Sequence, residues 1–161
     1  MGEPTVRFLG HTLSHNEIHP DPAKIEALKL CSAPCSQKQL RSFLGMVNFF
    51  YTAFLQNSSL VLCPLHRLLR KDVEWSWGEL EEGDFREAKA LLTEAPVLVP
   101  FDTTLPLSLV TDASLHGIGS VLEHVVTEGD AEVHMTIAFF SKSLNGATRT
   151  EGRNSTYVLQ G

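Results

Sequence analysis

The spacing of apolar residues changes once along the chain, near residues 72–78, and this change predicts two structurally different parts. Before it, apolar residues recur every three or four positions, as on one face of a helix; Leu40, Leu44 and Val47 are an example. After it, apolar runs are short, extended and broken by Pro, Gly and acidic turns. The sequence therefore predicts an α+β fold: a small three-helix bundle followed by a partial sheet.

Local signals place three helices in the first part. Asp21 suits an N-cap and is followed by a proline, which is tolerated at the first helical position. Ser36 and Gln39 have the spacing of a capping box, so a second helix is expected to begin there. A third is expected to begin near Asn57 and Ser58. These helices form the predicted bundle over residues 20–71.

Extended segments are expected on both sides of this bundle. Residues 6–14 alternate loosely between turn residues and predict a short strand or hairpin. Residues 79–94 predict one further helix, with acids near its N-terminus, where the helix dipole favours them. Four apolar runs then predict most of a sheet: residues 97–99, 105–110, 118–126 and 133–140.

Charge is divided unevenly between the two parts. The chain carries 13 Lys and Arg against 19 Asp and Glu, a net charge of −6. Residues 1–71 hold eight basic and four acidic side chains, whereas residues 72–161 hold five and fifteen. The basic part predicts contacts with nucleic-acid phosphates, and the alternative is that its cations only solvate helix faces. The predicted phosphate-binding residues are Lys24, Lys38, Arg41, Arg67, Arg70 and Lys71.

One carboxylate stands where an apolar strand gives way to a turn. Asp112 ends the run from Leu107, and a carboxylate there costs free energy unless it binds a cation or a hydrogen-bond donor. Gly117 and Gly119 follow, and glycines allow a ligand to approach the backbone closely. An aspartate at such a junction is also typical of an Asx turn. Metal ligation and a simple turn are therefore both open for Asp112.

Short sequence motifs follow one another along almost the whole chain and include most of these features. They are Phe8–His11, Pro20–Pro22 with Lys24, Leu40–Gly45, Pro64–Leu65 with Leu68–Leu69, Trp75–Trp77, Phe85 with Lys89, Leu92–Leu98, Thr111–Ser114, Gly117–Gly119 with Val121–Leu122, and Phe140–Leu144. On these residues the chain resembles the polymerase segment of gypsy-type long-terminal-repeat retrotransposons, which joins a reverse transcriptase to an RNase H-like domain. The resemblance implies a role connected with RNA-directed DNA synthesis and cleavage of RNA–DNA hybrids.

The resemblance also implies a division into four segments. Residues 1–19 correspond to the end of the palm, as a β-hairpin, and residues 20–71 to the thumb. Residues 72–102 correspond to a connection segment and residues 103–161 to a truncated RNase H-like domain. The implied partner is a template–primer duplex, RNA–DNA or DNA, bound by the basic N-terminal half. The implied cofactor is Mg²⁺, with Asp112 as the first of four carboxylates that hold two cations.

The chain departs from this family at the positions that perform catalysis. The polymerase aspartates precede the matched segment, and no Tyr-x-Asp-Asp motif occurs. Glu151 matches a non-catalytic glutamate of the family, so three of the four RNase H carboxylates are lacking. We expect the isolated chain to hold Mg²⁺ poorly and to be inactive. The alternative function is a non-catalytic nucleic-acid or protein interaction module.

A zinc site is a separate alternative. Cys31, Cys35, Cys63 and His66 are residue types that zinc binds in tetrahedral sites. The first two flank a predicted helix–helix loop, and the other two lie on a predicted helix with apolar spacing. Buried structural thiols are the competing interpretation.

Three further side chains are each open to two interpretations. His116 follows the Asp112 turn and could lie near a metal, or be an exposed turn residue. Trp75 and Trp77 could stack on bases, or pack between the two parts of the chain.

The sequence shows no secretory signal and no apolar run of membrane-spanning length, so an intracellular location is expected.

Overall fold

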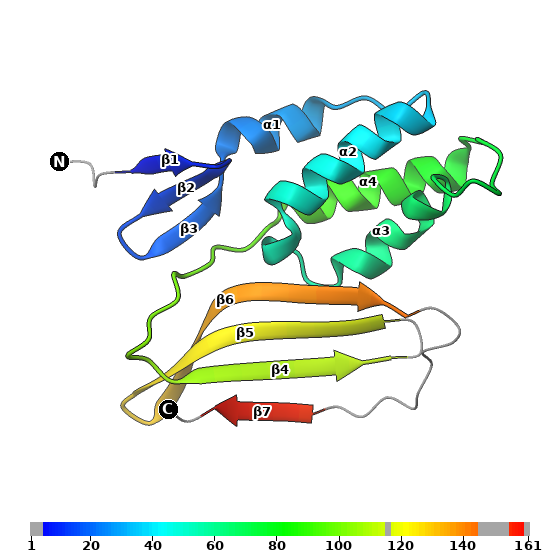
Figure 1. Cartoon of the computed structure of the whole chain (residues 1–161). Helices are drawn as coiled ribbons and strands as arrows, with labels where there is room; N and C mark the ends of the chain where they lie inside the picture. Colours follow the sequence, from blue (N-terminus) through cyan, green and yellow to red (C-terminus); the bar gives the residue numbers. More distant parts are fainter. Residues whose placement is uncertain (1–4, 115–116, 145–154, 160–161) are drawn as a thin grey trace.

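The computed structural model describes residues 5–114, 117–144 and 155–159 (Figure 1). A helical unit lies above a four-stranded sheet, and a small three-stranded sheet lies beside the first helix (Figure 1). The elements, in chain order, are β1 (Val6–Phe8), β2 (His11–Ser14), β3 (Glu17–Pro20), α1 (Pro22–Leu30), α2 (Gln37–Phe50), the 3₁₀ helix η1 (Thr52–Phe54), α3 (Ser58–Arg67), α4 (Glu79–Thr93), β4 (Leu107–Ala113), β5 (Gly117–Glu128), β6 (Ala131–Ser143) and β7 (Ser155–Leu159). The predicted α+β class is confirmed.

The helices begin where their caps were expected. The Asp21 carboxylate accepts a hydrogen bond from Ala23 N–H at 3.0 Å. The Ser36 hydroxyl accepts one from Gln39 N–H at 3.3 Å, and the Gln39 amide oxygen accepts one from Cys35 N–H at 2.7 Å. The reciprocal bond of the capping box therefore reaches one residue before the cap. These bonds satisfy backbone donors that the helix itself leaves unpaired.

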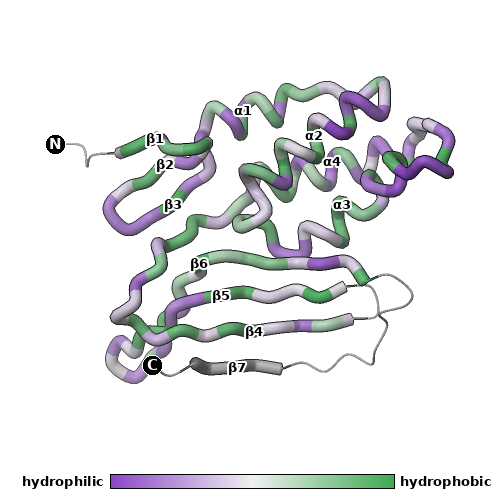
Figure 2. The backbone as a smooth tube through the Cα atoms, viewed as in Figure 1, coloured by the Kyte–Doolittle hydropathy of each residue, from purple (hydrophilic) through white to green (hydrophobic). Residues whose placement is uncertain are grey.

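The core of the helical unit is shared by all four helices. Leu28 of α1, Leu40 of α2 and Leu65 of α3 are fully buried, and Phe85 and Leu92 of α4 pack against the same cluster. The helix over 79–93 is thus a fourth member of the bundle, because its apolar face is needed to close the core. Figure 2 shows hydrophilic residues gathered where α3 leads into α4.

The N-terminal sheet contains one more strand than a hairpin. Its order is β1-β2-β3, and all pairs are antiparallel. Ile18 of β3 exchanges two backbone hydrogen bonds with Leu98, at 2.7 and 3.0 Å. Val99 N–H donates to Thr136 of β6 at 2.8 Å. The predicted apolar run over 97–99 therefore joins the two sheets rather than forming a strand of the larger one.

The larger sheet has the antiparallel order β6-β5-β4-β7. In its register Asp112 of β4 lies opposite Gly119 of β5, which in turn lies opposite Ser141 of β6. Paired residues share a face, so these three positions lie on one side of the sheet. Within the described ranges, no helix is long and apolar enough to span a membrane.

Buried His124 fixes the segment that enters the sheet. Its Nε2 accepts a hydrogen bond from Asp102 N–H at 3.0 Å, so its Nδ1 carries the proton and donates to Pro106 C=O at 3.1 Å. Its ring also stacks on Phe101, with centroids 5.9 Å apart. The imidazole thereby satisfies a backbone donor and a backbone acceptor of the loop before β4.

Candidate functional site

Asp112 lies on the side of the sheet that faces the helical unit. Its side chain is exposed, and it lines a cavity of about 90 Å³ together with Gln56 and Asn57, which precede α3. Gly119, Ser120 and sheet side chains complete the wall. The structure thus brings two residues of the helical unit, Gln56 and Asn57, into the cavity wall that Asp112 shares. The sequence does not predict this, because nothing in the local sequence relates either residue to Asp112.

The space beside the two glycines after Asp112 is occupied by residues at the start of α3 and is not left open for a ligand. A Cβ atom on Gly119 would lie 2.6 Å from the Asn57 amide oxygen. One on Gly117 would lie 2.9 Å from a methyl carbon of Leu60 and 3.0 Å from Lys142 C=O. The expectation that these glycines serve close ligand approach is therefore corrected: they let the start of α3 rest on β5.

Asn57 has an unusual backbone conformation for this contact. It is the residue before α3, with φ at 56° in the left-handed region, which asparagine tolerates better than most residues. Its side chain makes no capping hydrogen bond to α3. The carboxamide is instead directed at β5, beside Asp112.

These residues fit a two-cation centre poorly. Mg²⁺ prefers oxygen ligands, and Asp112 offers a carboxylate while Gln56 and Asn57 offer amide oxygens. However, no three His, Cys, Asp or Glu side chains within the described ranges are grouped to hold a metal. Glu151 and His116 lie outside the described residues. The described side chains alone therefore do not supply the ligands of a two-cation centre.

A second carboxylate on the same face is engaged elsewhere. Glu123 is 8% exposed, and one of its oxygens lies 2.7 Å from Nδ1 of His134. Glu123 pairs with Ser108, four residues before Asp112 on β4, which is a separation of roughly 13 Å at the rise of a strand. Glu123 and Asp112 therefore do not share a site.

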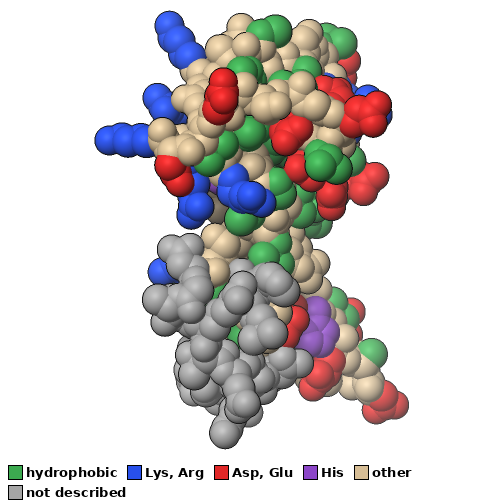
Figure 3. Space-filling model, turned by 90° about the vertical axis from the view of Figure 1, so that its right-hand side faces the viewer, with side chains coloured by type: hydrophobic (Ala, Val, Ile, Leu, Met, Phe, Trp, Pro, Cys, Tyr) green, Lys and Arg blue, Asp and Glu red, His purple; other side chains and the backbone are tan. Residues whose placement is uncertain are grey.

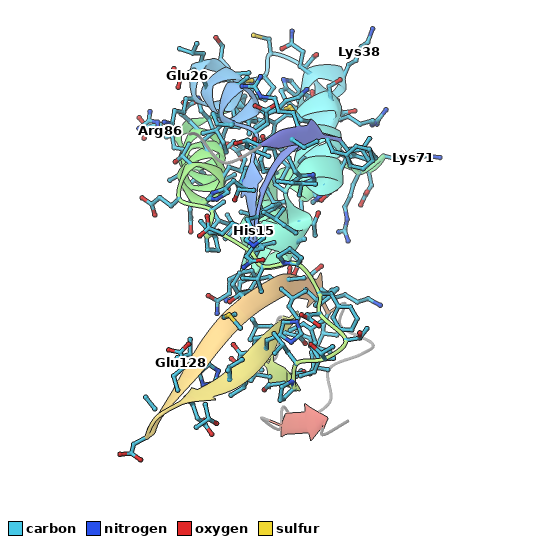
Figure 4. The ribbon with its side chains drawn as sticks, turned by 90° about the vertical axis from the view of Figure 1, so that its left-hand side faces the viewer. His15, Glu26, Lys38, Lys71, Arg86 and Glu128 are labelled. Atoms are coloured by element: carbon cyan, nitrogen blue, oxygen red, sulfur yellow. The ribbon has the colours of Figure 1, made fainter. Side chains whose placement is uncertain are left out.

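Cationic side chains gather on one side of the helical unit. Figure 3 shows most of the visible Lys and Arg on one side of it, with some acidic side chains among them, and most of the Asp and Glu on the other side. Lys38 and Lys71 project from the same side, and Glu26 and Arg86 lie on the opposite one (Figure 4). Of the predicted phosphate-binding residues, Lys38, Arg41, Arg67, Arg70 and Lys71 are exposed and Lys24 is half-buried.

Helix α2 presents a distinctive outer stripe on its exposed face, formed by Lys38, Ser42, Gly45 and Phe49. Their spacing of four, three and four residues places them on one line along the helix. Phe49 is 70% exposed, and a Cβ atom on Gly45 would meet nothing within 4 Å. Arg41 is exposed beside them. The sequence does not predict this stripe, and its one signal there is a glycine in the middle of a predicted helix.

The structure does not bring the four candidate zinc ligands together. Cys31 and Cys35 line a cavity beside α2, and Cys63 and His66 do not join them in any metal-binding group of described residues. All three cysteines are free. Burial lowers the pKa of His66.

The two tryptophans have a packing role. The rings of Trp75 and Trp77 stack with centroids 5.7 Å apart, and Trp77 lies edge-on to Phe85 at 5.8 Å. The Trp77 indole N–H donates to Glu82 at 3.1 Å. Both rings pack against the bundle core, so a packing role is confirmed, but the printed contacts are with the helical unit and not between the two parts of the chain.

Comparison with known proteins gives consistent similarities. Residues 77–157 match the family described as the RNase H-like domain found in reverse transcriptase. The Tf2-3 and Tf2-4 transposon polyproteins of Schizosaccharomyces pombe are each 31% identical over 142 residues, which are 88% of this chain. The chain spans only 10% of either polyprotein.

Solved structures of foamy viral protease-reverse transcriptase share the fold. The complex with RNA/DNA hybrid matches with a TM-score of 0.72 and 21% identity, over 88% of this chain and 19% of the viral one. The complex with dsDNA matches with a TM-score of 0.73 and 22% identity, over 89% and 29%.

Proposed function

The chain belongs to the family of RNase H-like domains found in reverse transcriptase, and from this premise we propose that its helical unit binds a nucleic-acid duplex along the outer stripe of α2. In this proposal residues 1–19 are the end of a palm, residues 20–71 a thumb, residues 72–102 a connection and residues 103–161 the RNase H-like part. The similar viral proteins were solved bound to RNA/DNA hybrid and to dsDNA, which supports a duplex as the ligand.

Gly45 is the observation that carries this proposal. A glycine inside a helix costs about 0.5–1 kcal/mol relative to alanine. Nothing within the described chain packs near its missing Cβ, so internal packing does not explain the glycine. A bare patch of helix backbone lets a bulky partner approach closely. A sugar–phosphate backbone meets this requirement where cations lie beside the patch: Arg41 lies about one turn before Gly45, and Lys38 about two turns before it. Gly83 of α4 also has no neighbour at its missing Cβ, but acidic residues lie about one turn before and after it.

The charge distribution supports the same partner. The chain as a whole is acidic, with a net charge of −6, so its average surface repels phosphates. Most of the cations visible in Figure 3 nevertheless lie on one side of the helical unit. Such segregation attracts a polyanion to that side and orients it.

Salt-dependent binding of a labelled RNA–DNA duplex tests the proposal. Neutralising n phosphates gives a slope of about −0.9n in a plot of log K against log salt. Arg41→Gln should weaken binding and reduce the steepness of this plot by about 0.9. Arg86→Gln removes the same charge from the opposite side of the unit and should leave both unchanged (Figure 4). Equal effects of the two variants would refute the assigned face.

We further propose that this chain by itself does not cleave the hybrid. In the family, two bound cations orient the attacking water and stabilise the leaving oxygen. Asp112 supplies one carboxylate toward such a centre, and Gln56 and Asn57 supply only neutral oxygens. Incubation of an RNA–DNA duplex with the chain and Mg²⁺ should give no cleavage. Cleavage that Asp112→Asn abolishes would contradict this.

A further inference from the structure

A cavity of about 740 Å³ lies beside the outer stripe of α2, and the proposed function makes no use of it. Its volume is in the range of pockets that bind small ligands. The walls are the loop between α1 and α2, the side of α2 and one ring of α4. The lining residues that carry the argument are Cys31, Cys35, Lys38, Ser42, Phe43 and Phe85. We call it the α1–α2 pocket.

The α1–α2 pocket has an apolar floor. Phe43 and Phe85 form it with their rings 4.8 Å apart, and Met46 extends it. The Lys89 ammonium lies over the Phe85 ring, 5.4 Å from its centroid, and donates a hydrogen bond of 2.7 Å to Cys31 C=O. This bond fixes the first residue of the loop against α4. The two rings of the floor, Phe43 and Phe85, also belong to the core of the helical unit, and this packing fixes their positions.

Its rim is cationic and hydrogen-bonding. Lys38 is the only charged side chain among the described lining residues, although the chain carries more acids than bases. Ser32, Ser36 and Gln39 add hydroxyl and amide groups around the mouth. An aromatic ring with polar edges and an attached anion matches this combination of floor, rim and charge.

We propose that the α1–α2 pocket takes one unpaired base of a nucleic-acid strand that is bound along α2. Lys38 and Ser42 belong both to the outer stripe and to the pocket, so a strand that follows the stripe passes the mouth. Phosphate at Lys38 and an apolar surface below it are the elements of single-strand binding sites. A paired base is held in its stack and cannot enter, which makes the pocket selective for unpaired nucleotides.

The inference rests on the proposed function, but the two can fail separately. The three cysteines provide the assay, because Cys31 and Cys35 line the pocket and Cys63 does not. The full chain is alkylated with N-ethylmaleimide, and peptide mass spectrometry follows each thiol. The additions compared are single-stranded oligothymidylate, an abasic strand of equal length, a blunt duplex and an acidic peptide with one phenylalanine.

Saturating oligothymidylate should slow alkylation of Cys31 and Cys35 about tenfold and leave Cys63 unchanged, as expected for one stacked base. The abasic strand and the blunt duplex should bind without protecting either thiol. Equal protection by the abasic strand, or none by oligothymidylate that binds, overturns the pocket assignment alone. Protection by the peptide only would overturn it in favour of a protein partner. Failure of every nucleic acid to bind overturns the proposed function as well.

A reciprocal measurement checks the assignment. Chain already alkylated at Cys31 and Cys35 should bind oligothymidylate about tenfold more weakly and blunt duplex equally well. A Cys63→Ser variant, altered outside the pocket, should bind both nucleic acids as wild type does before treatment. After treatment it carries the label only at Cys31 and Cys35 and should lose oligothymidylate binding to the same extent. Unchanged oligothymidylate binding by the fully alkylated chain would refute the pocket.

Discussion

The hydroxyl oxygens of Ser58 and Ser141 lie 2.9 Å apart and join the first turn of α3 to β6. Ser59 N–H donates to the same Ser141 oxygen, also at 2.9 Å. A side chain of the sheet thus satisfies a backbone donor at the start of α3, which is the role of an N-cap. This explains why Asn57 leaves α3 uncapped and turns to Gly119 instead.

Ser141→Ala should therefore destabilise the fold. It removes both hydrogen bonds and leaves the buried Ser58 hydroxyl and the Ser59 N–H to find new partners. Leaving such groups unsatisfied costs about 1–3 kcal/mol. Urea unfolding of the variant measures the loss. Ser32→Ala, at an exposed loop position, is the matched control and should change the free energy of unfolding by less than about 0.5 kcal/mol. Similar stability of both variants would show that Ser141 does not cap α3.

The two glycines under α3 should differ in their tolerance of a methyl group. Gly117→Ala meets a backbone carbonyl as well as Leu60, and such overpacking costs about 1–3 kcal/mol. Gly119→Ala meets only the end of the Asn57 side chain, which can rotate away, so it should cost less. Adding Asn57→Gly should recover most of that cost in a double-mutant cycle. A larger loss in Gly119→Ala than in Gly117→Ala would contradict the contact.

Gly45→Ala should separate stability from binding. A methyl group there has free space and favours the helix, so the free energy of unfolding should rise by about 0.5–1 kcal/mol. Duplex affinity should nevertheless fall, because the methyl group stands between α2 and the nucleic-acid backbone. Gly83→Ala is the matched control: this exposed glycine of α4 also has no neighbour within 4 Å. It should stabilise equally and leave binding unchanged. Unaltered binding by both variants would exclude the outer stripe as the interface.

Local chemistry made much of this fold predictable. Asp21 and Ser36 mark helix starts because their side chains bond to backbone two or three residues away, a distance that sequence alone fixes. The place of Asp112 near the end of a strand was predictable because it follows the apolar run that starts at Leu107. The helix over 79–93 was also expected, but its place in the bundle core depends on the space that the other helices leave.

The surroundings of Asp112 were not predictable from its own segment. Gln56 and Asn57 reach it only because α3 rests on β5, a contact between residues distant in the chain. The role of Gly119 changes for the same reason: its space is filled by Asn57 and is not left for a ligand. The outer stripe of α2 is similar, since sequence does not show that Gly45 lacks an internal neighbour.

Tyr51 should make the fold sensitive to alkali. Its side chain is fully buried, and burial, together with the negative charge of Asp21, raises its pKa from 10.0 to about 12. Between these two values the unfolded chain ionises Tyr51 while the folded chain does not, so stability is complete below about pH 10 and is lost as pH rises toward 12. The free energy of unfolding should fall by about 2–3 kcal/mol in total, because a pKa difference of one between the folded and unfolded chain corresponds to about 1.4 kcal/mol. Urea unfolding across this range should show the fall in wild type and a shallower one in Tyr51→Phe. Equal slopes in the two proteins would show that Tyr51 ionises as readily in the folded chain as in the unfolded one.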